Sequence, residues 1–567
     1  MNSTTTVPSP RRPIVLSGLT PYAGTFGRAE LIHLLKRTMF GAKKADIDFF
    51  NGKTLAQVVD TLLTSPTNVT PTLPVNNYDN AAAVPPQIDV AAPAGTTWVN
   101  ANEDGNFNGG RRNSMRAWWG GQMINQDRSV FEKMVIFWHN HFATENVDTT
   151  TLMFWNHLVL LRKAAFGNFK TLVNDVTYDV NMLRYLNGYV NNKTAPDENY
   201  ARELMELFTL GKGPDSQYTE ADVKAAAKIL TGWRIRNDQE LPVGSGRKPW
   251  QTYFNAGAHD TGSRTFSAFF SNKVISAAGS TTALNTEANA RKEISDLIDM
   301  IFTKEEVSKF ICRKLYTYFI YYEIDAATET NVITPLAEIF RTSNYDIKPV
   351  LKALFRSEHF FDVANKACLI KSPLDFTIGT IREFDITIPT AAADYLQQYQ
   401  AWNSVVGERN NGAAVQGQHI GNPPNVAGWP AYYQVPVFHE YWINTDSFPR
   451  RARYADSFLI TTGVSLGNNK FMLLDVLKFT DSFGNDASDP NKMIDSVLEL
   501  LYRVPISTKF KQYAKNILLS GQSSDYYWTD AWDAYKTNPT AMNTTTVKTR
   551  LTTFFRFLVS QPEYHLS

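Results

Sequence analysis

Apolar residues at helical spacing, preceded by capping residues, recur along most of this chain and limit the folds that it can adopt. Thr219 stands three residues before Asp222, and Ser129 stands three before Glu132, which is the spacing of a capping box. No strand–helix alternation recurs, so a doubly wound parallel sheet is disfavoured. Helices are predicted over 28–39, 129–141, 152–166, 219–232, 288–302, 307–322, 335–341, 373–384, 447–460, 492–502 and 547–559.

Long irregular stretches interrupt this helical pattern. Residues 65–111 and 237–282 are rich in small and turn-forming residues, and 401–445 combines Gly and Pro with aromatic side chains. Strand signals are confined to a hairpin expected over 250–266. The chain is therefore predicted to be mainly α, a large multi-helix globular array with long irregular loops and at most a small β-hairpin. The expected parts are an N-terminal extension (1–27), a main helical domain (28–400) with loop insertions at 65–111 and 237–282, an aromatic loop over a site (401–445) and a C-terminal helical part on the same body (446–567).

Composition excludes several classes of function. Lys and Arg number 56 and Asp and Glu 55, so the net charge gives no reason to expect nucleic-acid binding. No run of about 18 apolar residues is present, so no transmembrane segment is expected and the chain should be soluble. The apolar run at 14–16 is too short for a secretory signal. With only Cys312 and Cys368, at most one disulfide can form, and no all-cysteine metal site is expected.

His139 and His141 end an apolar segment and are the first candidate metal ligands. Residues two apart on a helix point about 200° away from each other, so both can bind one metal ion only where the helix ends. The alternative is one hydrogen-bonded histidine in the core and a second that is partly exposed.

A second polar cluster lies within a strongly apolar segment, 198–208. On a helix, Arg202, Glu203 and Glu206 share one face, and Glu198 lies one turn before Arg202. If that face is buried, its charges must be paired or bound to metal. The alternative is a solvated face held by pairs between residues four apart.

Two further motifs lie in irregular regions. His259 and Asp260 are adjacent, as a ligand pair or a base and its orienting group would be, or as parts of a plain turn. Gln418, Asn425 and Trp429 belong to a Gly- and Pro-rich stretch that forms either one wall of a binding cleft or a structural loop. Walker, dinucleotide and nucleophile-elbow motifs do not stand out, which disfavours nucleotide-driven chemistry.

The segments 137–142, 198–211 and 423–429 resemble the bacterial domain of unknown function 1800 (DUF1800) family. Shorter matching pieces lie at 34–41, 218–222, 230–233, 259–260 and 371–373. Val180 and Asn181 depart from the Pro-Ala that the family tends to carry. The resemblance implies no activity. Because members are often exported and encoded beside sulfatase-like proteins, it implies a periplasmic or cell-surface location and a sulfatase-like extracytoplasmic partner, although no signal peptide is visible in this chain.

The first functional hypothesis is a hydrolase acting on a glycan, ester or phosphoester. In it a divalent metal, zinc, iron or manganese, activates water. The expected ligands are His139, His141, Glu203, His259 and Asp260; Glu198 or Glu206 is the base, Arg202 and Arg313 hold an anionic group, and Gln418, Asn425 and Trp429 bind substrate. A metal-free form uses the paired carboxylates as acid and base.

The second hypothesis is a non-catalytic cell-surface protein with a buried His/Glu/Arg network. The loop around Trp429 would then bind a glycan or a partner protein by stacking. A bidentate contact of Arg202 with Glu203 or Glu206 would favour this network, whereas imidazole and carboxylate atoms about 2.0 to 2.2 Å from one point would favour the metal site.

Overall fold

The computed structural model describes residues 17–145, 149–277 and 286–567. The fold is mainly α, as predicted, with 56% of the residues in helices. Strands in these residues form only three two-stranded antiparallel sheets. No helix in the described ranges is long and apolar enough to cross a membrane. Cys312 and Cys368 are both free.

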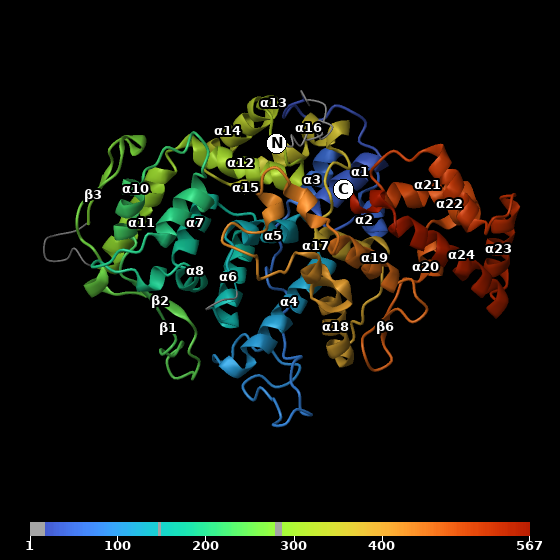
Figure 1. The fold of residues 1–567 in the computed structure, drawn as a ribbon, viewed down its shortest axis with the longest axis horizontal. Helices are drawn as coiled ribbons and strands as arrows, with labels where there is room; N and C mark the ends of the chain where they lie inside the picture. Colours follow the sequence, from blue (N-terminus) through green and yellow to red (C-terminus); the bar gives the residue numbers. More distant parts are fainter. Residues whose placement is uncertain (1–16, 146–148, 278–285) are drawn as a thin grey trace, which may run out of the picture.

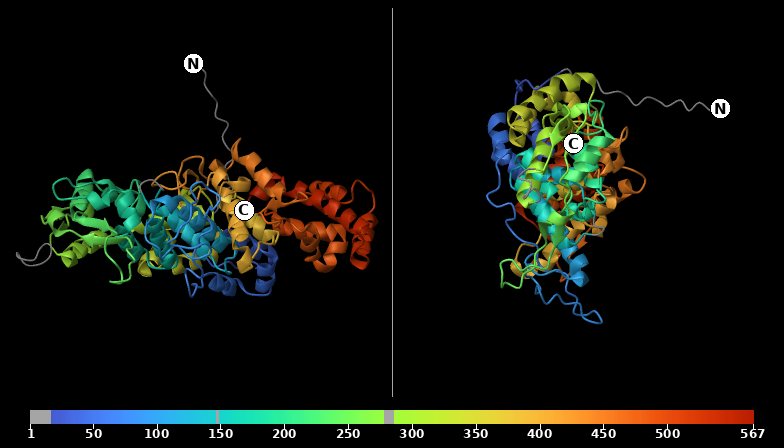
Figure 2. Two further views of the ribbon diagram at one scale, coloured as in Figure 1. Left: turned by 90° about the horizontal axis from the view of Figure 1, so that it is seen from below. Right: turned by 90° about the vertical axis from the view of Figure 1, so that its left-hand side faces the viewer.

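The molecule is elongated, and its middle is built from segments far apart in the sequence (Figures 1 and 2). Lys36 on α1 pairs with Glu383 on α17 at 2.5 Å, and Ile370 forms a β-bridge with Leu566. The middle therefore joins the first helix to the last described residues. Its helices are α1 (Arg28–Thr38), α2 (Lys44–Phe50), α3 (Leu55–Leu62), α4 (Asn108–Ile124), α5 (Phe131–His141), α6 (Thr151–Ala164), α12 (Glu305–Phe319), α13 (Ala326–Thr328), α14 (Thr334–Thr342), α15 (Ile347–Phe355), α16 (Glu358–Phe361), α17 (Pro373–Glu383), α18 (Tyr395–Val406) and α19 (Ser447–Ser457).

The two ends are formed by single stretches of chain (Figure 1). One end holds α7 (Phe169–Thr177), α8 (Val180–Tyr185), α9 (Asn199–Glu203), α10 (Glu220–Ile229) and α11 (Glu287–Ile301), with β1 (Trp233–Arg236), β2 (Gln251–Phe254), β3 (Arg264–Thr265) and β4 (Val274–Ile275). Towards the other end follow β5 (Val464–Ser465), β6 (Phe471–Met472), α20 (Val476–Asp481), α21 (Pro490–Leu501), α22 (Thr508–Leu518), α23 (Tyr526–Thr537) and α24 (Ala541–Val559).

Helix α5 lies in the middle of the core. Ten of its eleven residues are buried, so it contacts other elements on all sides. Its apolar side chains pack against α6, α12 and the segment after α18, and the rings of Trp138 and Phe169 stack 5.5 Å apart. This packing fixes the direction in which each polar side chain of α5 points.

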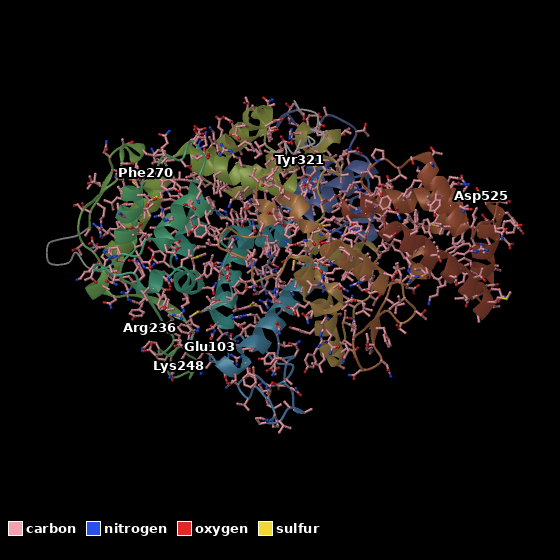
Figure 3. All side chains as sticks on the ribbon, viewed as in Figure 1. Glu103, Arg236, Lys248, Phe270, Tyr321 and Asp525 are labelled. Atoms are coloured by element: carbon pink, nitrogen blue, oxygen red, sulfur yellow. The ribbon has the colours of Figure 1, made fainter. Side chains whose placement is uncertain are left out.

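The two long insertions of the main domain contact each other at the lower edge of the molecule. Asn102 Nδ2 donates a hydrogen bond to Gly246 O at 2.9 Å, and Lys248 N donates to Asn102 Oδ1 at 2.8 Å. Trp250 Nε1 donates to Glu103 Oε2 at 3.0 Å, in the region where Glu103 and Lys248 are labelled in Figure 3. Residues 278–282 of the second insertion and 1–16 of the N-terminal extension lie outside the described residues.

Helices occupy all the predicted ranges, and the largest difference is the last helix, which begins at Ala541 instead of 547. The predicted hairpin over 250–266 is wrong. Strand β2 pairs with β1, which precedes it in the chain, and β3 pairs with β4, which follows it. The two strands of that range therefore belong to different sheets. The capping box of Ser129 with Glu132 is also wrong. Both Glu132 oxygens accept from Arg162, at 2.9 and 2.6 Å, because a bidentate charged pair is stronger than a bond to one backbone amide.

Candidate functional site

The two histidines at the end of α5 point to different parts of the molecule, as their spacing predicts. The ring of His139 is fully buried among aromatic side chains, 5.3 to 5.6 Å from three rings (Trp119, Phe154 and Trp429). Its Nε2 accepts a hydrogen bond from Gly421 N at 3.1 Å. Burial lowers the pKa of His139 to about 3, so the ring is neutral and its proton is on Nδ1.

His141 faces the segment that follows α9. Its Nε2 donates to the Phe208 carbonyl at 3.0 Å, and its Nδ1 is 3.1 Å from Lys314 Nζ, which donates. Burial lowers the pKa of His141 well below its usual value, and the Lys314 charge lowers it further. The pKa of Lys314 itself falls to about 7 through burial. Both nitrogens of His141 are therefore used within the fold.

The carboxylate-rich segment begins as α9 and continues as the π-helix η3 (Leu204–Thr209). Arg202 makes a bidentate ion pair with Glu220, with both distances 2.7 Å, and a weaker one with Glu198 at 3.2 Å. The bidentate pair of Arg202 with Glu203 or Glu206 that would have favoured the network is not present. A π-helical turn of this kind is frequent at functional sites.

Glu203 and Glu206 have unlike surroundings. Glu206 pairs with Lys212 at 2.5 Å. Glu203 Oε2 is buried and has no hydrogen-bond partner among the described residues. Burial, and then the charge of Glu206, raises the pKa of Glu203. Burial and the same charge raise the pKa of Tyr218 to about 12, so this phenol keeps its proton beside the pair.

His259 and Asp260 take part in a buried network that the sequence did not reveal. His259 Nδ1 donates to Thr231 O at 2.8 Å, and its Nε2 lies 3.5 Å from Glu293 Oε1. Arg264 bridges the acids, at 2.7 Å from Glu293 and 3.1 Å from Asp260. Glu293 is on α11, so the sequence could not connect it with the His-Asp pair.

The predicted substrate-binding residues are held by separate partners. Arg313 pairs with Glu306 and Glu329, at 2.5 and 2.7 Å. In the 401–445 loop, Gln418 Oε1 accepts from Leu374 N at 3.0 Å and Asn425 Nδ2 donates to Tyr433 at 2.9 Å. Trp429 is buried, and its backbone N–H donates to Asn140 Oδ1 at 2.9 Å. The loop is therefore fastened to α5 and α17.

The side chains predicted to bind a metal ion do not come together around one point. His139 contacts the loop, His141 contacts η3, and His259 and Asp260 belong to the network with Glu293. Across the parts of the chain that the structure describes, no group of three or more His, Cys, Asp or Glu side chains could hold a metal ion. Binding of zinc, iron or manganese stays a prediction.

The 401–445 loop covers a small cavity of about 40 Å³. Lys133 of α5 and Asp375 of α17 form an ion pair there, and Ser372 Oγ donates to Asp375 Oδ2 at 2.9 Å. Tyr318 and Tyr432 complete this side, with ring centroids 5.4 Å apart. Lys133 is not among the residues predicted from the sequence, although a lysine in an otherwise apolar helix is a usable signal. A cavity of this volume has room for only a few water molecules, so it is too small for a glycan.

Comparison with family models gives one match, to a family described as "Protein of unknown function (DUF1800)", over residues 33–566. The match spans nearly the whole chain, and the chain belongs to this family. Comparison with curated proteins and with solved structures gave no match.

Proposed function

We propose that this DUF1800 protein is a hydrolase that uses Glu203 and Glu206 as acid and base. The observation that supports the proposal is the contrast between the two carboxyl groups. Glu203 has a buried oxygen without a partner among the described residues and a raised pKa, whereas Glu206 faces the Lys212 ammonium. Neighbouring carboxyl groups with such unlike surroundings are typical of acid–base pairs.

In the proposed reaction Glu203 donates its proton to the leaving-group oxygen of a glycan, ester or phosphoester. Glu206 accepts a proton from the water whose oxygen attacks the substrate, so the bond to the leaving group breaks as the bond to water forms. The attacking water needs room between the two carboxyl groups, which lie about 6.5–9.5 Å apart in glycosidases that use one as acid and the other as base. Arg202, about one third exposed, would hold an anionic group if one is present.

Family membership is the support for the rest of the proposal: a periplasmic or cell-surface location and a sulfatase-like partner. The partner part is tested by pulling down the tagged chain from the periplasmic fraction of its source cells and looking for a sulfatase-like protein by mass spectrometry.

The test of the reaction compares the wild-type chain with Glu203→Gln and Glu206→Gln on p-nitrophenyl glycosides, acetate and phosphate, and on polysaccharides by reducing-end release. The expected loss in kcat/KM is about 100-fold or more for each variant. Glu220→Gln is the matched control on the uncharged substrates, because Glu220 begins the neighbouring helix α10 and its carboxylate pairs with Arg202.

The pH profile gives a second readout. Because Glu203 must be protonated to act, activity should fall as the pH rises through its raised pKa, and this limb should be absent in Glu203→Gln. Equal rates in wild type and both variants on a substrate that the wild type hydrolyses would contradict the proposal.

A second candidate is the non-catalytic binding protein, favoured by the internal hydrogen bonds of the family motif 137–142 and of the 401–445 loop. His139, Asn140 and Gln418 all form internal hydrogen bonds that join the 401–445 loop to the core. This candidate predicts glycan binding with no hydrolysis of any substrate in the same panel, and binding that is unchanged in Glu203→Gln.

A further inference from the structure

We propose that a surface groove next to the start of α5 binds a neutral, hydroxyl-rich ligand of the oligosaccharide class. The groove has a volume of about 500 Å³, within the range of small-molecule sites. It lies between the chain that follows α3, the end of α4 and the start of α5, and its polar lining includes Asn68, Gln122, Asn125, Gln126, Glu132 and Arg162. It is separate from Glu203 and Glu206.

The charges that line the groove cancel. Arg162 is held by Glu132 in the bidentate pair described above, and both side chains are buried. The other two charged residues of the lining are Arg128 and Asp127. Two positive and two negative side chains leave no net charge to attract an anion or a cation, so the groove suits a ligand that is polar but uncharged.

Gln126 is the clearest sign of a ligand. Both of its amide atoms, Oε1 and Nε2, are buried and neither has a hydrogen-bond partner among the described residues. A buried amide without partners costs free energy, and a side-chain amide offers an acceptor beside two donors. Neighbouring hydroxyl groups of a sugar supply the complementary donor and acceptor once this side chain, which is only partly buried as a whole, turns its amide into the groove.

The other amides of the lining are held in place by the protein. Gln122 Nε2 donates to Thr72 Oγ1 at 3.1 Å, and Asn125 Nδ2 donates to Gly121 O at 3.0 Å. Asn68 Oδ1 accepts from Thr70 N at 2.9 Å. Fixed amides lose little conformational entropy when a ligand binds, which favours binding.

An aromatic ring borders the amides. Phe49 is 45% exposed, and the Arg128 guanidinium lies 4.1 Å from the centre of its ring. Its remaining exposed carbon atoms would contact the apolar C–H face of a sugar ring. A polar lining with one such ring matches the two kinds of surface that a pyranose presents.

The test is titration calorimetry on the full chain with cellotetraose, maltotetraose and chitotetraose, and with tetragalacturonic acid as the charged comparison. At least one neutral tetrasaccharide should bind. Gln126→Leu should raise its Kd about tenfold, which is the loss of affinity expected when one or two hydrogen bonds are removed. Asn68→Ala should raise this Kd as well. Gln522→Leu, at an exposed glutamine after α22, is the control and should bind as the wild type does.

Three results would overturn the inference: no binding of any neutral tetrasaccharide, tighter binding of the acid than of the neutral sugars, or wild-type affinity in both groove variants. Glu203→Gln separates this inference from the proposed reaction. It should bind the tetrasaccharide normally even where hydrolysis is lost, so either proposal can fail without the other.

Discussion

Gly428→Ala tests whether the 401–445 loop is held against α5 as closely as the structure indicates. Gly428 has φ +92°, and a Cβ atom there would lie 2.6 Å from the Asn140 carbonyl oxygen and closer still to Asn140 Oδ1. The backbone oxygen cannot move away without disturbing the end of α5. Gly417, in the same loop, has φ +104° and nothing within 4 Å of an added Cβ, which makes it the matched control.

The two substitutions share one cost and differ in the other. A left-handed backbone conformation costs a residue with a Cβ atom about 1–2 kcal/mol, and this applies to both. Overpacking costs about 1–3 kcal/mol more and applies only to Gly428. We therefore expect Gly428→Ala to destabilise the loop by about 2–5 kcal/mol and Gly417→Ala by about 1–2 kcal/mol.

Hydrogen exchange of peptides that cover residues 419–432 measures this difference directly, because local opening exposes the backbone amides. The difference of about 1–3 kcal/mol corresponds to exchange that is about 5- to 150-fold faster in Gly428→Ala than in Gly417→Ala. Peptides from α22 should exchange equally in both. Equal exchange of the loop in the two variants would refute the close contact between the loop and α5.

Three further predictions concern buried polar groups of the same region. Glu132→Gln should lower the free energy of unfolding by about 3–5 kcal/mol, measured by urea denaturation, because it leaves the buried Arg162 charge without its carboxylate. The pKa of Lys314 is about 7 in the folded state and lies below its unfolded value, so the unfolded state binds more protons between pH 7 and 10. The free energy of unfolding should therefore rise with pH in this range, by up to about 1.4 kcal/mol per pH unit. Urea denaturation curves of Lys314→Met should lack this rise. His139→Ala should lower the free energy of unfolding by about 2–5 kcal/mol, because it opens a cavity among three aromatic rings and removes the acceptor of Gly421 N. The same variant tests the metal prediction by elemental analysis beside the untagged wild type. An equal metal content in both proteins would contradict His139 as a metal ligand.

The helices could be predicted because their signals are local. The capping box of Thr219 with Asp222 forms as expected, since both partners lie within four residues. Ser129 with Glu132 has the same spacing and fails, because Arg162 on the next helix competes for the carboxylate. The hairpin over 250–266 fails for a similar reason, since strand pairing depends on which partner the rest of the fold brings near.

The candidate site was harder to predict because burial and pairing depend on contacts distant in sequence. The opposite directions of His139 and His141 follow from helix geometry alone, but their partners at Gly421 and Phe208 do not. Glu203 and Glu206 are three residues apart, yet only the structure shows that one has a buried carboxyl oxygen and the other is paired with Lys212.

Helix α5 connects the three regions for which functions are proposed. Its first turn holds Arg162, which lines the groove, through Glu132, and its last turn holds the loop through His139 and η3 through His141. A rigid, fully packed helix passes small displacements along its length, since a close-packed core does not absorb them. Substitutions in the family motif at its end are therefore expected to alter the groove and the carboxylate pair together, and such effects alone do not identify a catalytic residue.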